Sequence, residues 1–78
     1  MTRAAKLKSK LRAGAIDARE LRTLLKQEGW RLDRVRGSHE FWERGTLTFV
    51  LATHSKDLKP YQLRQAREVL LSEEESNG

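Results

Sequence analysis

Cysteine is absent from this chain of 78 residues, and proline occurs only once. Without cysteine, neither a disulfide bond nor a thiolate zinc site can stabilise the fold. No apolar run approaches the roughly 20 residues that a membrane-spanning helix needs. The basic N-terminus also lacks the apolar stretch and cleavage site of a secretory signal. These absences favour a small, soluble, cytoplasmic protein that does not associate with a membrane.

Positive charge is concentrated in the first half of the chain. Residues 1–36 carry 11 Lys and Arg against 4 Asp and Glu, whereas residues 37–71 carry 5 against 4. The segment from residue 72 to residue 78 is acidic, with three glutamates and no apolar residue. A high pI with clustered Lys and Arg is typical of nucleic-acid-binding domains, although a charged surface that only maintains solubility gives the same totals.

The first 16 residues form a basic extension, and a helix is predicted after them over residues 17–28. Leu7 and Leu11 are four residues apart, so the extension is either a weak amphipathic helix that docks these leucines on the core or a flexible arm that contacts phosphates. The later helix has an Asp-x-x-Glu capping box at its start. Gly29 supplies a left-handed C-cap at its end.

Three short strands are predicted next, over residues 30–36, 38–44 and 46–52. Gly37 and Gly45 mark the two tight turns, so the strands should form an antiparallel meander. Strict alternation places His39 on the same face as Phe41, although the aromatic Phe41 looks like a core residue and His39 a surface one. Either a β-bulge at residues 37–38 changes this register, or Trp42 faces the core and Phe41 faces outward.

A final helix is predicted from Pro60 to about Leu71, because proline suits the first position of a helix. Leu63, Ala66, Val69 and Leu70 should form its buried stripe. The predicted domain therefore covers residues 17–71 and is followed by a disordered acidic tail over residues 72–78. Its element order is α-β-β-β-α, an α+β fold in which two helices cover one face of a three-stranded antiparallel sheet.

The candidate site lies in the segment Arg34–Trp42. His39 is the candidate catalytic residue, because imidazole can both accept and donate a proton near neutral pH. Arg34 and Arg36 suit a phosphate group. Further candidates for RNA contact are Ser38, Lys56 and Lys59, while Gly37 forms the turn. A strand histidine without any reactivity is the alternative for His39, and His54 remains an alternative second catalytic histidine. No metal or other cofactor is expected, because the sequence lacks close metal-ligand spacing.

Three blocks of sequence make the chain resemble the HicA toxins of bacterial and archaeal HicA–HicB toxin–antitoxin pairs. They are Leu24–Trp30, Arg36-Gly-Ser-His39, and Asp57-Leu-Lys-Pro60 followed by Leu63. The resemblance covers roughly residues 17–71. It implies a fold like the double-stranded RNA-binding domain and a ribonuclease activity on mRNA. It also implies a catalytic role for His39 and neutralisation by a HicB-like antitoxin that covers this histidine.

Two other functions fit the same pattern of elements. One is a non-catalytic RNA-binding module, since double-stranded RNA is recognised largely through its shape and phosphates. The other is a protein-interaction domain whose exposed sheet face binds a partner. Substitution of His39 by alanine separates these functions, because only the nuclease would lose catalysis.

Overall fold

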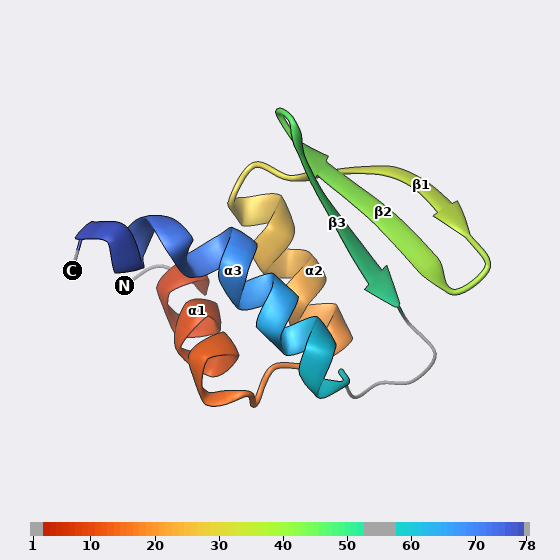
Figure 1. Ribbon diagram of the computed structural model, residues 1–78. Coiled ribbons are helices and arrows are strands. Elements are labelled where there is room, and N and C mark those ends of the chain that lie inside the picture. Colours follow the sequence, from red (N-terminus) through yellow and green to blue (C-terminus); the bar gives the residue numbers. More distant parts are fainter. Residues whose placement is uncertain (1–2, 53–57, 78) are drawn as a thin grey trace.

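A computed structural model describes residues 3–52 and 58–77. Three helices and one three-stranded sheet make up this part of the chain (Figure 1). In chain order they are α1 (Arg3–Ala13), α2 (Ala18–Gln27), β1 (Arg31–Arg36), β2 (His39–Arg44), β3 (Leu47–Ala52) and α3 (Pro60–Asn77). From α2 onward the order is α-β-β-β-α, which confirms the predicted α+β fold. Helix α1 precedes that unit.

Helix α2 begins and ends where the capping residues predict. The Asp17 carboxylate accepts a hydrogen bond from the backbone N–H of Glu20, at 2.8 Å, and the Glu20 carboxylate accepts one from the N–H of Asp17, at 3.1 Å. At the other end Gly29 has a φ of +90°. The Trp30 N–H then donates to the carbonyl of Leu25 at 2.9 Å, as in a Schellman motif. Both caps are therefore confirmed.

The N-terminal extension contains helix α1, which shares the hydrophobic core with the rest of the fold. Leu7 and Leu11 are buried, and α1 packs against both α2 and α3. The Arg67 guanidinium on α3 also donates a hydrogen bond to the Leu11 carbonyl, at 3.1 Å. The prediction that these two leucines dock on the core is thus confirmed, and a flexible arm is excluded for residues 3–13.

Two tight turns join the three strands into an antiparallel sheet with the order β1-β2-β3. Arg36 pairs with His39 in the first hairpin, so residues 37 and 38 form its two-residue turn. Gly37 has a φ of +57°, and Gly45 has a φ of +60° at the same position of the second hairpin. A glycine of positive φ at the first turn position is the pattern of a type II′ turn, whose twist matches that of the flanking strands.

The two faces of the sheet differ in what covers them. The core-facing side carries Trp42, Phe49 and Leu51, which are buried against the helices. Phe41 lies on the opposite, open face together with His39. The register is shifted at Asp33 in β1, between Leu32 and Arg34, and not at residues 37–38. Of the two predicted alternatives, the one with Trp42 inward and Phe41 outward is therefore correct.

Helix α3 is longer and packs differently from the prediction. It runs to Asn77 instead of ending near Leu71. No proline or glycine interrupts this stretch, and glutamate is a good helix former. Leu63 and Val69 are only partly buried, whereas Gln62 is buried. No helix within residues 3–52 and 58–77 is long and apolar enough to cross a bilayer.

Candidate functional site

His39 is the first residue of β2 and lies at the end of the sheet, directly after the glycine turn. Its side chain is exposed. Its cross-strand neighbours are Arg36 on β1 and Ala52 on β3. Side chains of residues directly opposite each other in an antiparallel pair lie on the same face, with Cβ atoms about 4.5–5.5 Å apart. The fold therefore brings together His39 and Arg36, two of the predicted site residues.

Arg34 lies on the same open face, two residue pairs further along the hairpin. Its cross-strand neighbour is Phe41, and its guanidinium carbon lies 5.0 Å from the centroid of the Phe41 ring. This distance is within the roughly 6 Å of a cation–π interaction, in which the ring attracts the guanidinium. The Asp33 carboxylate is 4.0 Å from Nε of Arg34, and both side chains are largely exposed. Arg34, Arg36 and His39 thus form one group on the open face.

The remaining predicted residues lie around this group. Gly37 forms the turn, and Ser38 is half-buried in it, immediately before His39. Lys59 is exposed, directly before the start of α3. Lys56 and His54 lie outside the described residues.

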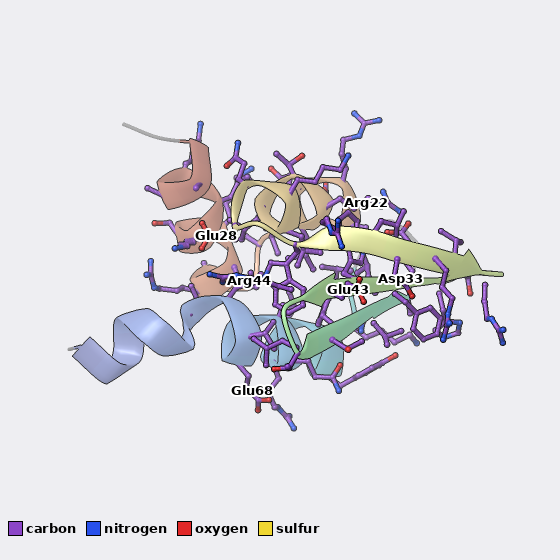
Figure 2. The ribbon with its side chains drawn as sticks, turned by 90° about the horizontal axis from the view of Figure 1, so that it is seen from above. Arg22, Glu28, Asp33, Glu43, Arg44 and Glu68 are labelled. Carbon is purple, nitrogen blue, oxygen red and sulfur yellow. The ribbon has the colours of Figure 1, made fainter. Side chains whose placement is uncertain are left out.

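Glu40, the residue after His39, anchors the start of β2 to helix α2. Its carboxylate accepts hydrogen bonds from Nε of Arg22 at 2.9 and 3.0 Å and from Nη2 of Arg22 at 2.8 Å. The indole N–H of Trp42 donates to the same carboxylate at 3.1 Å. The hydrogen bond to Glu40 raises the pKa of the Arg22 guanidinium. Figure 2 shows Arg22 where α2 meets the sheet. The strand that carries His39 is therefore fixed from its core-facing side.

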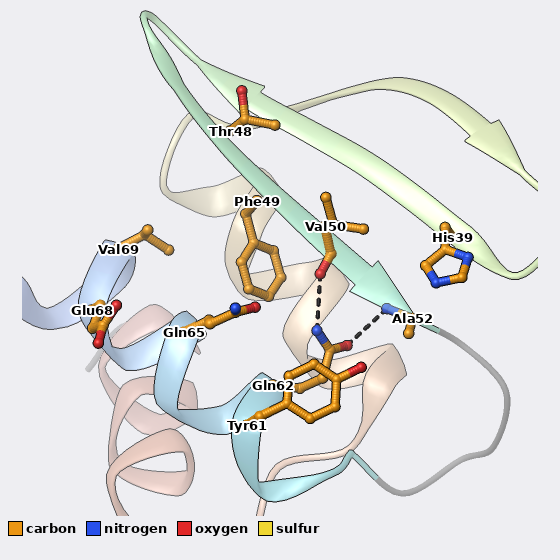
Figure 3. A pocket seen from close by; sticks show the side chains of 10 residues that line it. All are labelled: His39, Thr48, Phe49, Val50, Ala52, Tyr61, Gln62, Gln65, Glu68 and Val69. Carbon is orange, nitrogen blue, oxygen red and sulfur yellow. Dashed lines mark hydrogen bonds between the residues drawn. The ribbon is translucent and has the colours of Figure 1, made fainter.

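A pocket opens beside His39, between β3 and the first turns of α3 (Figure 3). Its volume is about 520 Å³, and its lining includes His39, Ala52, Tyr61, Gln62 and Gln65. The buried Gln62 side chain accepts a hydrogen bond from the Ala52 N–H at 2.7 Å and donates one to the Val50 carbonyl at 2.9 Å. These two backbone groups belong to the edge of β3 that no other strand pairs with, so Gln62 gives them hydrogen-bond partners and joins α3 to β3.

The glutamines and Tyr61 were not among the predicted site residues. The sequence signal that could have found them is weak: polar residues at positions 62 and 65, one turn apart, at the start of an otherwise amphipathic helix. Nothing in the sequence shows which strand this part of the helix contacts. Within the described part of the chain, no cluster of three His, Asp or Glu side chains is arranged to hold a metal ion.

Comparison with protein-family models identifies the family of the chain. The family model of the HicA toxin of bacterial toxin–antitoxin systems matches residues 18–70, which include α2, the whole sheet and most of α3. No curated protein and no solved structure matched the chain. Because the family model covers well over half of the sequence, the chain belongs to the HicA toxin family and is a toxin of a toxin–antitoxin system.

Proposed function

We propose that this toxin is a metal-independent endoribonuclease that cleaves mRNA, with His39 as its acid or base. The observation that carries the proposal is the pairing of His39 with Arg36 across β1 and β2, with Arg34 next to them on the same open face. A proton-transfer group thus lies beside two fixed positive charges on an exposed surface. The membership in a toxin family supports the same function.

Cleavage of RNA without a metal ion requires two proton transfers and stabilisation of the negative charge on the phosphoryl oxygens, and these residues can supply one of the transfers and the stabilisation. The 2′-oxygen loses its proton and attacks the phosphorus, the P–O5′ bond breaks, and the 5′-oxygen gains a proton. His39 acts as the base in the first transfer, or as the acid in the second when it is cationic. Arg34 and Arg36 stabilise the negative charge that builds on the phosphoryl oxygens. Ser38, Lys56 and Lys59 are proposed as further RNA contacts, and Gly37 sets the turn that presents His39.

The test compares wild type with His39→Ala at matched, soluble expression, by growth and by the integrity of cellular mRNA. General acid–base catalysis contributes about 10²–10⁴-fold, so the variant should lose cleavage by roughly that factor and no longer arrest growth. His54→Ala, which removes the other histidine of the chain, should retain activity if one histidine suffices. A wild-type protein that binds RNA but leaves it intact would instead indicate a non-catalytic RNA-binding module.

We further propose that a HicB-like antitoxin neutralises the toxin by covering His39. The surface around Arg34 and Arg36 is basic, so the antitoxin should present acidic or hydrogen-bonding groups there. Amide hydrogen exchange of the complex should show protection at the β1–β2 turn. Protection confined to the C-terminal part of α3, with the turn unchanged, would contradict this mode of neutralisation.

A further inference from the structure

The pocket between β3 and α3 borders the group formed by Arg34, Arg36 and His39, because His39 also lines the pocket. His39 and Ala52 lie at one end of it, and Thr48, Glu68 and Val69 lie towards the other (Figure 3). Tyr61 and Gln65 project from successive turns of α3 along its length. The volume of about 520 Å³ is within the range of small-molecule sites. The pocket is therefore continuous with the proposed cleavage site and large enough for one nucleobase.

Tyr61 has the properties of a stacking residue. It is 49% exposed although it is aromatic, so its ring does not serve the hydrophobic core. In Figure 3 its hydroxyl points towards the end of the pocket where His39 lies. An exposed aromatic ring beside a basic surface is how many RNA-binding proteins hold an unpaired base, because every base has a π-face.

Among the polar side chains that line the pocket, Gln62 is already hydrogen-bonded to the protein, whereas Tyr61 and Gln65 can contact a ligand. The Gln62 amide makes two hydrogen bonds to the backbone of β3, so it forms a rigid wall. Among residues 3–52 and 58–71, neither the Tyr61 hydroxyl nor the Gln65 amide has a hydrogen-bond partner. An amide can both donate and accept, so Gln65 suits the edge of a base.

Charge orients the ligand within the pocket. A phosphate is favoured at the end near His39, where Arg36 is the cross-strand neighbour, and is disfavoured near the Glu68 carboxylate at the other end. The backbone of an RNA strand would therefore follow the open face of the sheet, with a base turned into the pocket.

We propose that this pocket binds an unpaired base of the RNA next to the scissile phosphate, with Tyr61 stacking on the base and Gln65 contacting its edge. The proposal rests on the proposed ribonuclease function and adds to it the substrate class, a single-stranded RNA. Since Tyr61 would act through binding alone, it is a base-binding residue and not a catalytic one.

The test measures binding of two fluorescein-labelled, single-stranded 2′-O-methyl oligonucleotides of equal length, which lack the 2′-hydroxyl nucleophile and so cannot be cut. One carries a mixture of bases and the other is abasic. Tyr61→Ala should weaken binding of the first roughly 5- to 150-fold, the range that base–aromatic stacking spans, and should leave binding of the second unchanged. Tyr61→Phe should bind both like wild type. Leu47→Ala is the matched control, because Leu47 is equally exposed, at 48%, and does not line the pocket.

Cleavage of ordinary RNA provides the second readout. Tyr61→Ala should raise KM and leave kcat close to that of wild type, because a group that only binds does not change the chemical step. Circular dichroism should show an unchanged fold. Equal binding of the base-bearing oligonucleotide by wild type and Tyr61→Ala would overturn the proposal. So would a loss of antitoxin binding with RNA binding intact, which would make the pocket a protein interface.

Different results would refute the base pocket and the ribonuclease function. If wild type cleaves RNA and His39→Ala does not, while Tyr61→Ala behaves like wild type, then only the base pocket is refuted. If wild type neither binds nor cleaves RNA, the ribonuclease function itself is refuted, and the base pocket with it.

Discussion

Replacement of Glu40 by alanine should destabilise the fold strongly, because one carboxylate serves two donors on different elements. It accepts from the Arg22 guanidinium on α2 and from the indole N–H of Trp42 on its own strand. The Glu40 side chain is 12% exposed and that of Arg22 is 36% exposed. Trp42 is almost completely buried. After the substitution, water can reach the guanidinium in part, but it cannot easily reach the indole N–H.

The magnitude follows from these exposures. A hydrogen bond to a charged group contributes about 1.5–3 kcal/mol, and a buried donor left without a partner costs about 1–3 kcal/mol. Because Arg22 is partly hydrated, the loss should be smaller than the sum of these two terms. We therefore expect the free energy of unfolding to fall by about 2–4 kcal/mol. For a domain of this size 1 kcal/mol corresponds to about 4–8 °C, so the melting temperature should fall by roughly 8–30 °C.

Glu43→Ala is the matched control, since it is the same substitution on the same strand but on the open face. The Glu43 carboxylate lies 3.8 Å from the Arg31 guanidinium, and their side chains are 43% and 83% exposed. Such a pair contributes about 0–1 kcal/mol. Urea unfolding of the two variants and wild type, followed by tryptophan fluorescence, measures the difference. Equal destabilisation by both substitutions would refute the assignment of Glu40 as the anchor of β2.

Two further predictions concern the N-terminal half of the chain. Leu11→Ala should lower the free energy of unfolding, measured by thermal unfolding, by about 2–5 kcal/mol, because Leu11 is completely buried and its removal leaves a cavity that solvent cannot fill. A loss below about 0.5 kcal/mol would mean that α1 is not part of the core. Glu20→Gln tests the pH dependence of stability, because hydrogen bonds from Lys10 and from the Asp17 backbone lower the pKa of the Glu20 carboxyl from its ordinary value of 4.5. The charged form is the stabilising one, so wild type should be more stable than this variant at neutral pH. The difference should disappear as the pH falls below 4.5 and through the lowered pKa; a difference that persists in acid would point to packing as its cause.

Much of the local structure could be predicted from short segments of sequence, because the interactions that determine it are themselves local. The capping box of α2 joins residues three apart, and the Schellman motif at Gly29 closes within five residues. The hairpin turns depend on Gly37 and Gly45, which adopt a positive φ at little steric cost. The element order and the proximity of Arg36 to His39 follow from these turns, since a two-residue turn pairs the residues on either side of it.

Long-range packing decided what the local patterns left open. Both orientations of Phe41 and Trp42 satisfy strand alternation, and the choice of Trp42 for the core depends on the helices and on the Glu40 carboxylate, two residues earlier on the same strand. Whether the basic extension was an arm or a helix depended on a surface to receive Leu11, which α2 and α3 together provide.

The pocket beside His39 depends most on tertiary structure. Its two walls come from β3 and α3, and the hydrogen bonds that hold them together join Gln62 to backbone atoms ten and twelve residues away. By itself, the sequence determined the elements from α2 onward, their order and the group around His39, because each of these depends on neighbouring residues. Only the tertiary structure placed Tyr61 and Gln65 next to that group, because their position depends on the angle and register at which a helix packs against an edge strand.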